Sequence, residues 1–194
     1  MSKRTLFLIF ALFLITFVLL MMALYQPQAP KATQITTIKE PVAQTILSFG
    51  NPSIATSSSI TTLNYSLPIN IQTFKNKATA VQLELQYDPE ILINVTVVPG
   101  SFFANPDVLL NQIDSKTGRI SYAFGIGLTG QGVVGQGTVA TLSFSVIAGT
   151  AKQTAIIFLP KTLVTAEGIR ESVLKETFNG LFTVGEKPST SSAQ

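Results

Sequence analysis

The sequence predicts an all-β domain, a two-sheet antiparallel sandwich of about nine strands, preceded by a single N-terminal transmembrane helix. Three observations lead to this prediction. The chain begins with one long uncharged apolar segment. The later apolar segments are short, alternating and bounded by Gly, Pro, Asn or Asp. No stretch of about 12 residues among them repeats with a helical period.

The N-terminal segment is long enough to cross a bilayer. Residues 5–25 contain no charge, and as a helix they extend roughly 31 Å, about the thickness of the hydrocarbon core. Lys3 and Arg4 precede the segment, and the next basic residue is Lys31. The positive-inside rule therefore places residues 1–4 in the cytoplasm and the chain after the helix outside.

An uncleaved signal anchor is favoured over a cleaved signal peptide. The apolar segment is longer than a typical signal h-region of roughly 7–15 residues, and no good small-x-small cleavage pair follows it. The chain has no cysteine, which excludes a lipoprotein anchor. We therefore expect a single-pass protein of the cell membrane with an extracytoplasmic C-terminal domain.

Two polar segments flank the predicted domain. Residues 26–45 are expected to be a linker, because Pro27, Pro30 and Pro41 interrupt regular structure. Residues 186–194 are rich in Ser and Thr and are expected to be a disordered tail. The domain itself is expected to span residues 46–185.

Nine short segments of this domain are predicted to be strands. In Val81–Tyr87, for example, apolar residues alternate with Gln82, Glu84 and Gln86, so that one face meets the core and the other meets water. The predicted strands are Ile46–Phe49, Leu63–Thr73, Val81–Tyr87, Ile91–Val98, Ile120–Gly127, Thr138–Ile147, Thr154–Phe158, Leu163–Ala166 and Phe178–Val184.

Composition argues against several functions. The chain has neither histidine nor cysteine, so Ser-His and Cys-His nucleophiles, disulfides and thiolate metal sites are unavailable. Apart from Lys3 and Arg4 it carries 11 basic and 10 acidic residues, with no basic cluster for nucleic acid. Ser-Lys and metal-carboxylate chemistry are not excluded by composition, but no cluster of residues indicates them, and we expect no enzymatic activity, cofactor or metal.

Four segments, taken in order, resemble a known family. Val81–Leu92 (VQLELQYDPEIL) and Val97–Phe103 (VVPGSFF) are followed by Gly118–Phe124 (GRISYAF) and Gly135–Val146 (GQGTVATLSFSV). This series of strands and turns resembles the cohesin domain family over residues 46–185. Within it, Asp88 and Pro89 are expected to form a structural turn, since Pro89 fixes its own φ and the Asp88 carboxylate can accept turn N–H groups.

The resemblance implies a jelly-roll sandwich that binds a dockerin-like module or surface protein. Dockerins carry paired calcium loops of the EF-hand type, whereas the segment from Asp114 to Arg119 lacks the alternating acidic ligands. The chain is therefore expected to be the receptor, which attaches its partner at the cell surface.

The resemblance also implies a partner-binding face. In dockerin-binding cohesins, one sheet face carries an acidic or amide pair on the third strand and apolar contacts on the fifth. Alignment on the Tyr-Asp-Pro turn assigns these positions to Gln82 with Glu84 and to Ser121 with Ala123. The same pattern also fits a solvated strand face. The face predicted in full comprises Gln82, Glu84, Gln86, Ser121, Ala123, Thr141 and Ser143.

Two other functions fit the sequence. Cohesins are related in fold to carbohydrate-binding modules, so the chain could bind polysaccharide during its breakdown. The chain has no tryptophan, and Tyr65 and Tyr122 are then the candidate sugar-stacking residues. A structural surface or pilus-like subunit, with sheet edges that pair with its own copies, is the second alternative.

Overall fold

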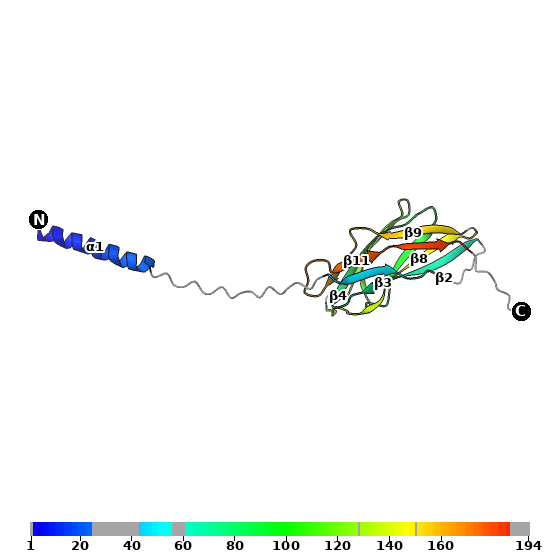
Figure 1. Ribbon diagram of the computed structural model, residues 1–194, viewed down its shortest axis with the longest axis horizontal. Coiled ribbons are helices and arrows are strands. Elements are labelled where there is room, and N and C mark those ends of the chain that lie inside the picture. Colours follow the sequence, from blue (N-terminus) through cyan, green and yellow to red (C-terminus); the bar gives the residue numbers. More distant parts are fainter. Residues whose placement is uncertain (1, 25–42, 56–60, 128, 150, 187–194) are drawn as a thin grey trace. The chain divides into compact units, whose positions relative to one another are not determined.

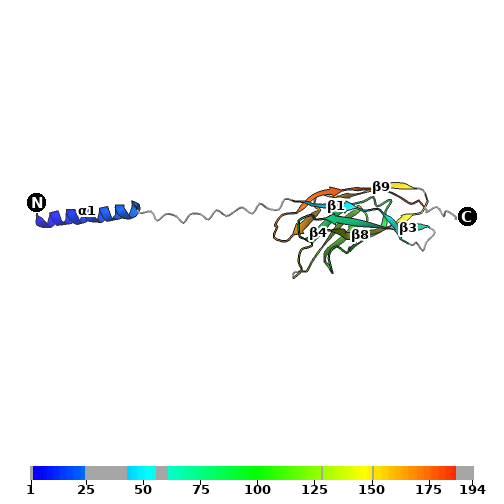
Figure 2. The same ribbon diagram turned by 60° about the horizontal axis from the view of Figure 1, so that its bottom comes forward.

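The computed structural model describes residues 2–24, 43–55, 61–127, 129–149 and 151–186. The chain divides into two compact units, residues 1–39 and 40–194, which hold the helix and the strands respectively (Figures 1 and 2). Almost all of the predicted linker and of the predicted tail lies outside the described residues.

The first unit contains one helix, α1 (Lys3–Leu24), 22 residues long. Its segment Lys3–Met22 has a mean hydropathy of 2.9, and none of it is buried inside the structure. Its apolar side chains, such as Phe7 and Phe13, are largely exposed. By length and composition this helix can cross a membrane, in agreement with the predicted N-terminal helix.

The second unit is a sandwich of two six-stranded sheets. One sheet has the order β11-β1-β3-β8-β5, with β2 paired to β3, and the other has the order β12-β9-β4-β7-β6, with β10 paired to β4. The strands are β1 (Thr45–Phe49), β2 (Ser53–Ala55), β3 (Thr62–Gln72), β4 (Ala78–Gln86), β5 (Ile93–Pro99), β6 (Asp107–Asp114), β7 (Arg119–Gly125), β8 (Gln136–Ile147), β9 (Lys152–Phe158), β10 (Leu163–Ala166), β11 (Leu174–Phe178) and β12 (Gly180–Val184).

The predicted fold class is confirmed, with three strands more than expected. The additional strands are β2, β6 and β11, all of which are short or largely exposed. Because such strands bury little, their sequences lack the apolar alternation that marks the other nine. The pairing also differs in one place, since β1 and β11 run parallel whereas the other paired strands are antiparallel.

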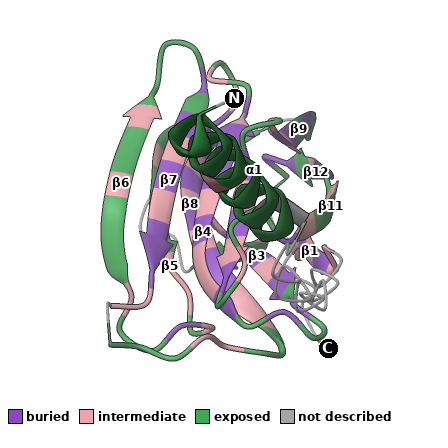
Figure 3. Cartoon of the chain, turned by 90° about the vertical axis from the view of Figure 1, so that its left-hand side faces the viewer, coloured by how far each residue is buried: buried purple, intermediate pink, exposed green. Residues whose placement is uncertain are grey.

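The core lies between the two sheets, where each long strand turns every second side chain inward. On β3 and β8 the buried side chains face each other across the register, as Leu67 does with Leu142. The opposite sheet contributes Leu83 and Leu85 from β4 and Tyr122 from β7. Figure 3 shows this alternation as buried and half-buried bands along β7. Period-two burial therefore determines which side chains remain on the outer faces.

The β6–β7 hairpin depends on Gly118. Its φ is +70°, and a Cβ at this position would overlap the Tyr87 carbonyl oxygen and the Pro89 ring. The hairpin turn is also closed by the Gly118 N–H, which donates to the Asp114 carbonyl at 2.8 Å. Gly118 thus packs against the residues that follow β4, and Arg119, the first residue of β7, comes directly after it.

We expect Gly118→Ala to destabilise the domain more than Gly168→Ala. Gly168 has a φ of +74° but no atom within 4 Å of a built Cβ, so its replacement costs only the left-handed penalty of roughly 1–2 kcal/mol. Gly118→Ala adds steric overlap of roughly 1–3 kcal/mol. Urea unfolding of the full chain in detergent micelles, followed by tyrosine fluorescence, measures both. Equal losses would contradict the proposed close contact.

Candidate functional site

The outer face of the sheet that contains β4, β7 and β6 brings together most of the predicted face. Across β4 and β7, Gln82 lies opposite Ala123 and Glu84 lies opposite Ser121. The outer residue beside Gln86 is Arg119. We call this surface the β4–β7–β6 face; it comprises Gln82, Glu84, Gln86, Ser121, Ala123 and Arg119 together with the β6 residues Leu110, Gln112 and Asp114.

Glu84 occupies the centre of this face and is buried, with 5% of its surface exposed. Its Oε2 accepts a hydrogen bond from Ser121 Oγ at 2.8 Å and forms an ion pair with Arg119 at 3.4 Å. Its Oε1 accepts a hydrogen bond from Gln82 Nε2 at 3.1 Å. The interpretation of these β4 residues as a freely solvated strand face therefore does not describe Glu84.

The surroundings of Glu84 keep it ionised. Burial alone would raise the pKa of its carboxyl, but the hydrogen bonds from Ser121, Gln82 and Arg119 and the charge of Arg119 outweigh burial and lower the pKa below its ordinary value. The backbone is fixed as well, because the Glu84 N–H donates to Thr162 Oγ1 at 3.1 Å. The result is a rigid carboxylate with its hydrogen-bonding partners already in place.

Strand β6 adds apolar side chains that the sequence prediction missed. Leu109 is 72% exposed at an irregularity in the pairing of β6 with β7, and Leu110 is half-buried opposite Ala123. Figure 3 shows β6 as a largely exposed strand at the edge of its sheet. Because β6 was not predicted, β7 was counted as the fifth strand. Ser121 and Ala123 in fact lie next to β6, the strand that carries Leu109 and Leu110.

Thr141 and Ser143 do not lie on the β4–β7–β6 face. Both are on β8, where they pair with Pro68 and Ser66 of β3 in the other sheet. Alternation correctly assigns them to an outer face, but it cannot say which of the two sheets a strand joins. The seven predicted residues therefore divide between opposite outer faces of the sandwich.

Tyr65 and Tyr122 cannot serve as sugar-stacking platforms in this structure. Only 5% and 1% of their surfaces are exposed. The Tyr65 ring stacks on Phe144 at 5.4 Å between centroids, and its hydroxyl accepts a hydrogen bond from the Gly185 N–H at 3.0 Å. Both occupy inward positions of their strands, so the prediction that they stack on sugars is wrong.

The predicted Asp-Pro turn directly follows β4. Asp88 Oδ1 accepts a hydrogen bond from the Glu90 N–H at 2.9 Å, and the Asp88 carbonyl accepts one from the Leu92 N–H at 2.9 Å.

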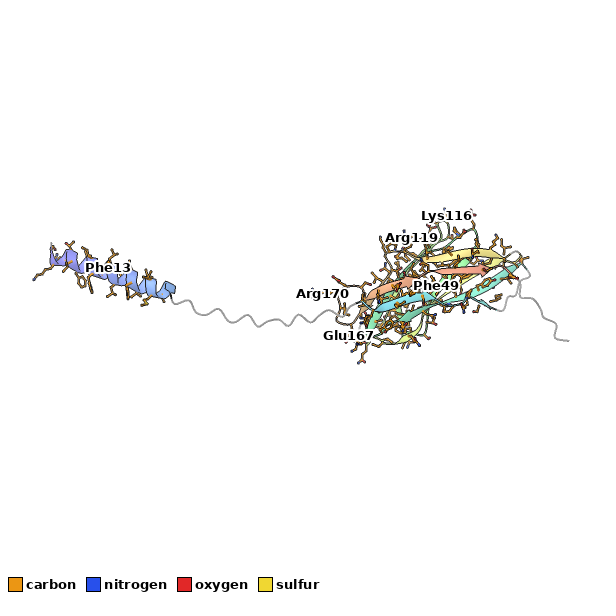
Figure 4. The ribbon with its side chains drawn as sticks, in the orientation of Figure 1. Phe13, Phe49, Lys116, Arg119, Glu167 and Arg170 are labelled. Atoms are coloured by element: carbon orange, nitrogen blue, oxygen red, sulfur yellow. The ribbon has the colours of Figure 1, made fainter. Side chains whose placement is uncertain are left out.

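At the neighbouring β6–β7 hairpin, Lys116 lies on the same side of the domain as Arg119 (Figure 4). Within the described ranges, no group of three or more His, Cys, Asp or Glu side chains could hold a metal ion.

Comparison with known proteins identifies related domains. A family model for the cohesin domain matches residues 64–184. The structure of CaCohA2 from Clostridium acetobutylicum is 21% identical, with 74% of this chain and 92% of that chain covered and a TM-score of 0.54. No curated protein matches the chain.

Two further solved structures have the same fold. The third cohesin ScaC from Acetivibrio cellulolyticus, in complex with the ScaB dockerin, is 18% identical, covers 71% of this chain and 96% of its own, and has a TM-score of 0.56. The seventh ScaB type I cohesin from Pseudobacteroides cellulosolvens is 16% identical, covers 77% and 97%, and has a TM-score of 0.57.

We expect Glu84→Gln to flatten the loss of stability in acid. Because the pKa of Glu84 is lower in the folded than in the unfolded state, its contribution is present above the unfolded pKa and is lost as the pH falls through the folded pKa. In the parent protein the free energy of unfolding should therefore decline below about pH 4.5, and less steeply in Glu84→Gln. Glu171→Gln, at an exposed carboxylate, is the control. The prediction fails if both variants decline as the parent does.

Proposed function

The chain belongs to the cohesin domain family, and from this premise we propose that it is a membrane-anchored extracytoplasmic module that attaches a dockerin-like partner at the cell surface. Cohesin domains are non-catalytic binding modules, so family membership also confirms the expectation that this chain is not an enzyme. We therefore expect the surface of the domain to contain a site that binds a protein partner.

Matched structures support a dockerin-like partner. The Acetivibrio cellulolyticus cohesin was solved in complex with a dockerin, and so was the OlpA cohesin of Clostridium thermocellum, which is 14% identical with a TM-score of 0.54. These observations concern those proteins. For this chain, they make a dockerin-like module the first partner to test.

The β4–β7–β6 face supports a protein partner on its own chemistry. Protein interfaces combine apolar contacts at the centre with hydrogen-bonding groups around them. Here Leu110 supplies apolar area on the face, with the exposed Leu109 next to it on β6, while Arg119 supplies a half-exposed guanidinium that Glu84 holds in position. We infer that these residues form the partner-binding surface and that Glu84 acts by positioning its neighbours.

Helix α1 supports the membrane anchor. Its 22 residues correspond to roughly 33 Å of helix, and its exposed apolar side chains would be covered by lipid tails. The basic residues lie only at its N-terminal end, which favours a cytoplasmic N-terminus. The proposed order is then cytoplasmic residues 1–4, an anchor at 5–25, a linker at 26–45, the binding domain at 46–185 and a tail at 186–194.

We expect Leu110→Asp to weaken partner binding at least about tenfold, because it removes apolar contact and places an unpaired charge in the interface. The partners to test are dockerin modules encoded in the genome of the source organism, titrated with calcium into the full chain in detergent micelles. Calorimetry gives the dissociation constant of each variant.

Thr141→Asp is the matched control for this experiment, because it places the same charge on the outer face of the opposite sheet. It should bind as tightly as the parent. Weaker binding by Thr141→Asp with unchanged binding by Leu110→Asp would mean that the partner binds the sheet that contains Thr141, contrary to the proposal.

A double Lys substitution of Gln82 and Glu84 is a poorer test, since Glu84 is buried and a Lys in its place would disturb the fold.

The mature protein is expected to retain its N-terminal helix. Membranes washed with alkaline carbonate should keep the chain in the pellet, and its intact mass should include residues 5–25. A cleaved signal peptide would instead give a soluble domain with an N-terminus beyond residue 25. Mass spectrometry of the mature polypeptide distinguishes the two outcomes.

A further inference from the structure

The sheet opposite the proposed partner face is almost free of charge. Five of its six strands, β1, β2, β3, β5 and β8, contain no Asp, Glu, Lys or Arg, and its only charged residues, Lys175 and Glu176, are on the edge strand β11. The other sheet carries charges on four strands, β4, β6, β7 and β9. The outer side chains of the uncharged sheet are nevertheless polar, being mostly Ser, Thr, Asn and Gln.

Part of this face forms an open groove of about 450 Å³ across β1, β3 and β8. We call it the amide groove; its polar side chains are Ser48, Asn70, Gln72, Gln136 and Thr138. Thr138 Oγ1 donates a hydrogen bond to Asn70 Oδ1 at 3.2 Å. The Ser48 hydroxyl and the side-chain amides of Gln72 and Gln136 have no hydrogen-bond partner among the described residues. These groups are therefore available to a ligand.

Phe74 extends the amide groove with an aromatic ring. A smaller hollow of about 180 Å³ is lined by Phe74 and shares Gln72 and Gln136 with the groove. Phe74 is 47% exposed, and no aromatic contact joins its ring to another described side chain. Amide groups and an exposed aromatic face thus form one continuous surface.

The backbone at Phe74 is strained, with a φ of 51° that is unusual for a bulky side chain. Its neighbours hold this conformation: the Thr73 N–H donates to the Gly135 carbonyl at 2.9 Å, and the Gly135 N–H donates to Thr73 Oγ1 at 2.8 Å. Such strain persists only where the surroundings impose it, and it is often found at ligand sites. Here the strained residue carries a half-exposed phenyl ring.

We propose that the amide groove and Phe74 bind a neutral oligosaccharide. Amide and hydroxyl groups can both donate to and accept from sugar hydroxyls, and the apolar face of a pyranose ring can pack on an exposed aromatic ring. The residues that line the groove are uncharged, whereas Lys75 and Lys175 line a neighbouring hollow with Phe74, so the test includes an anionic hexasaccharide. A protein partner is disfavoured because the groove lacks the apolar centre and arginine typical of protein interfaces. This site is independent of the proposed partner face.

The test titrates neutral hexasaccharides of glucose, xylose and mannose into the full chain by calorimetry. The micelles are of dodecyl dimethylamine oxide, because a maltoside detergent would itself present sugar. We expect saturable binding of at least one hexasaccharide. Phe74→Gly removes the ring while relieving the strained backbone, so it should keep a cooperative unfolding transition and lose at least about tenfold in affinity. Gln136→Ala, at an exposed position, should lose affinity severalfold.

Two controls separate this site from other surfaces. Phe74→Trp should retain binding, because it keeps an aromatic ring, and Leu110→Asp should have no effect, because it lies on the opposite sheet. The proposal is overturned if no neutral hexasaccharide binds at ~5 mM or if only a galacturonate hexasaccharide binds. It is also overturned if Phe74→Gly and Gln136→Ala bind like the parent, or if sedimentation shows a second copy of the chain covering the groove.

Discussion

The structure depends on the burial of the two inner sheet faces against each other. No disulfide is available, since the chain has no cysteine, and no metal-binding cluster is present among the described residues. Apolar side chains such as Leu67, Leu83 and Leu142 are fully buried between the sheets and stabilise the sandwich. Their period-two spacing leaves every other side chain outside, and a shift of one residue in any long strand would reverse that assignment.

The outer faces carry two different chemistries as a result. On one sheet, a buried carboxylate organises a polar cluster beside the exposed Leu109 and the half-buried Leu110, and the neighbouring strands contribute charges of both signs. On the other sheet the strands present uncharged amides and hydroxyls, with a strained phenylalanine at one end of a groove. A sandwich offers two such surfaces without conflict, because the core separates them.

Much of this arrangement could be predicted from the sequence, and what was missed has a physical explanation. Strands with one buried face, such as β3 and β4, were found because their apolar residues alternate. The edge strand β6 was missed because it buries too little to alternate, and it is the strand that carries Leu109 and Leu110. Pairing of β8 with β3 could not be read from local periodicity, which explains the wrong sheet assigned to Thr141 and Ser143. The burial of Glu84 likewise depends on partners from β7 that are distant in sequence.

The position of β1 has a mechanical consequence. The strand is the first of the sandwich after the N-terminal helix, and it lies between β3, which is antiparallel to it, and β11, which is parallel. A pull along β1 would act nearly perpendicular to the hydrogen bonds on both of its sides. These bonds would then bear the load together in shear, and they could not open one after another as in a zipper. If α1 anchors the domain as proposed, a load that enters through β1 would be resisted by this whole set of hydrogen bonds.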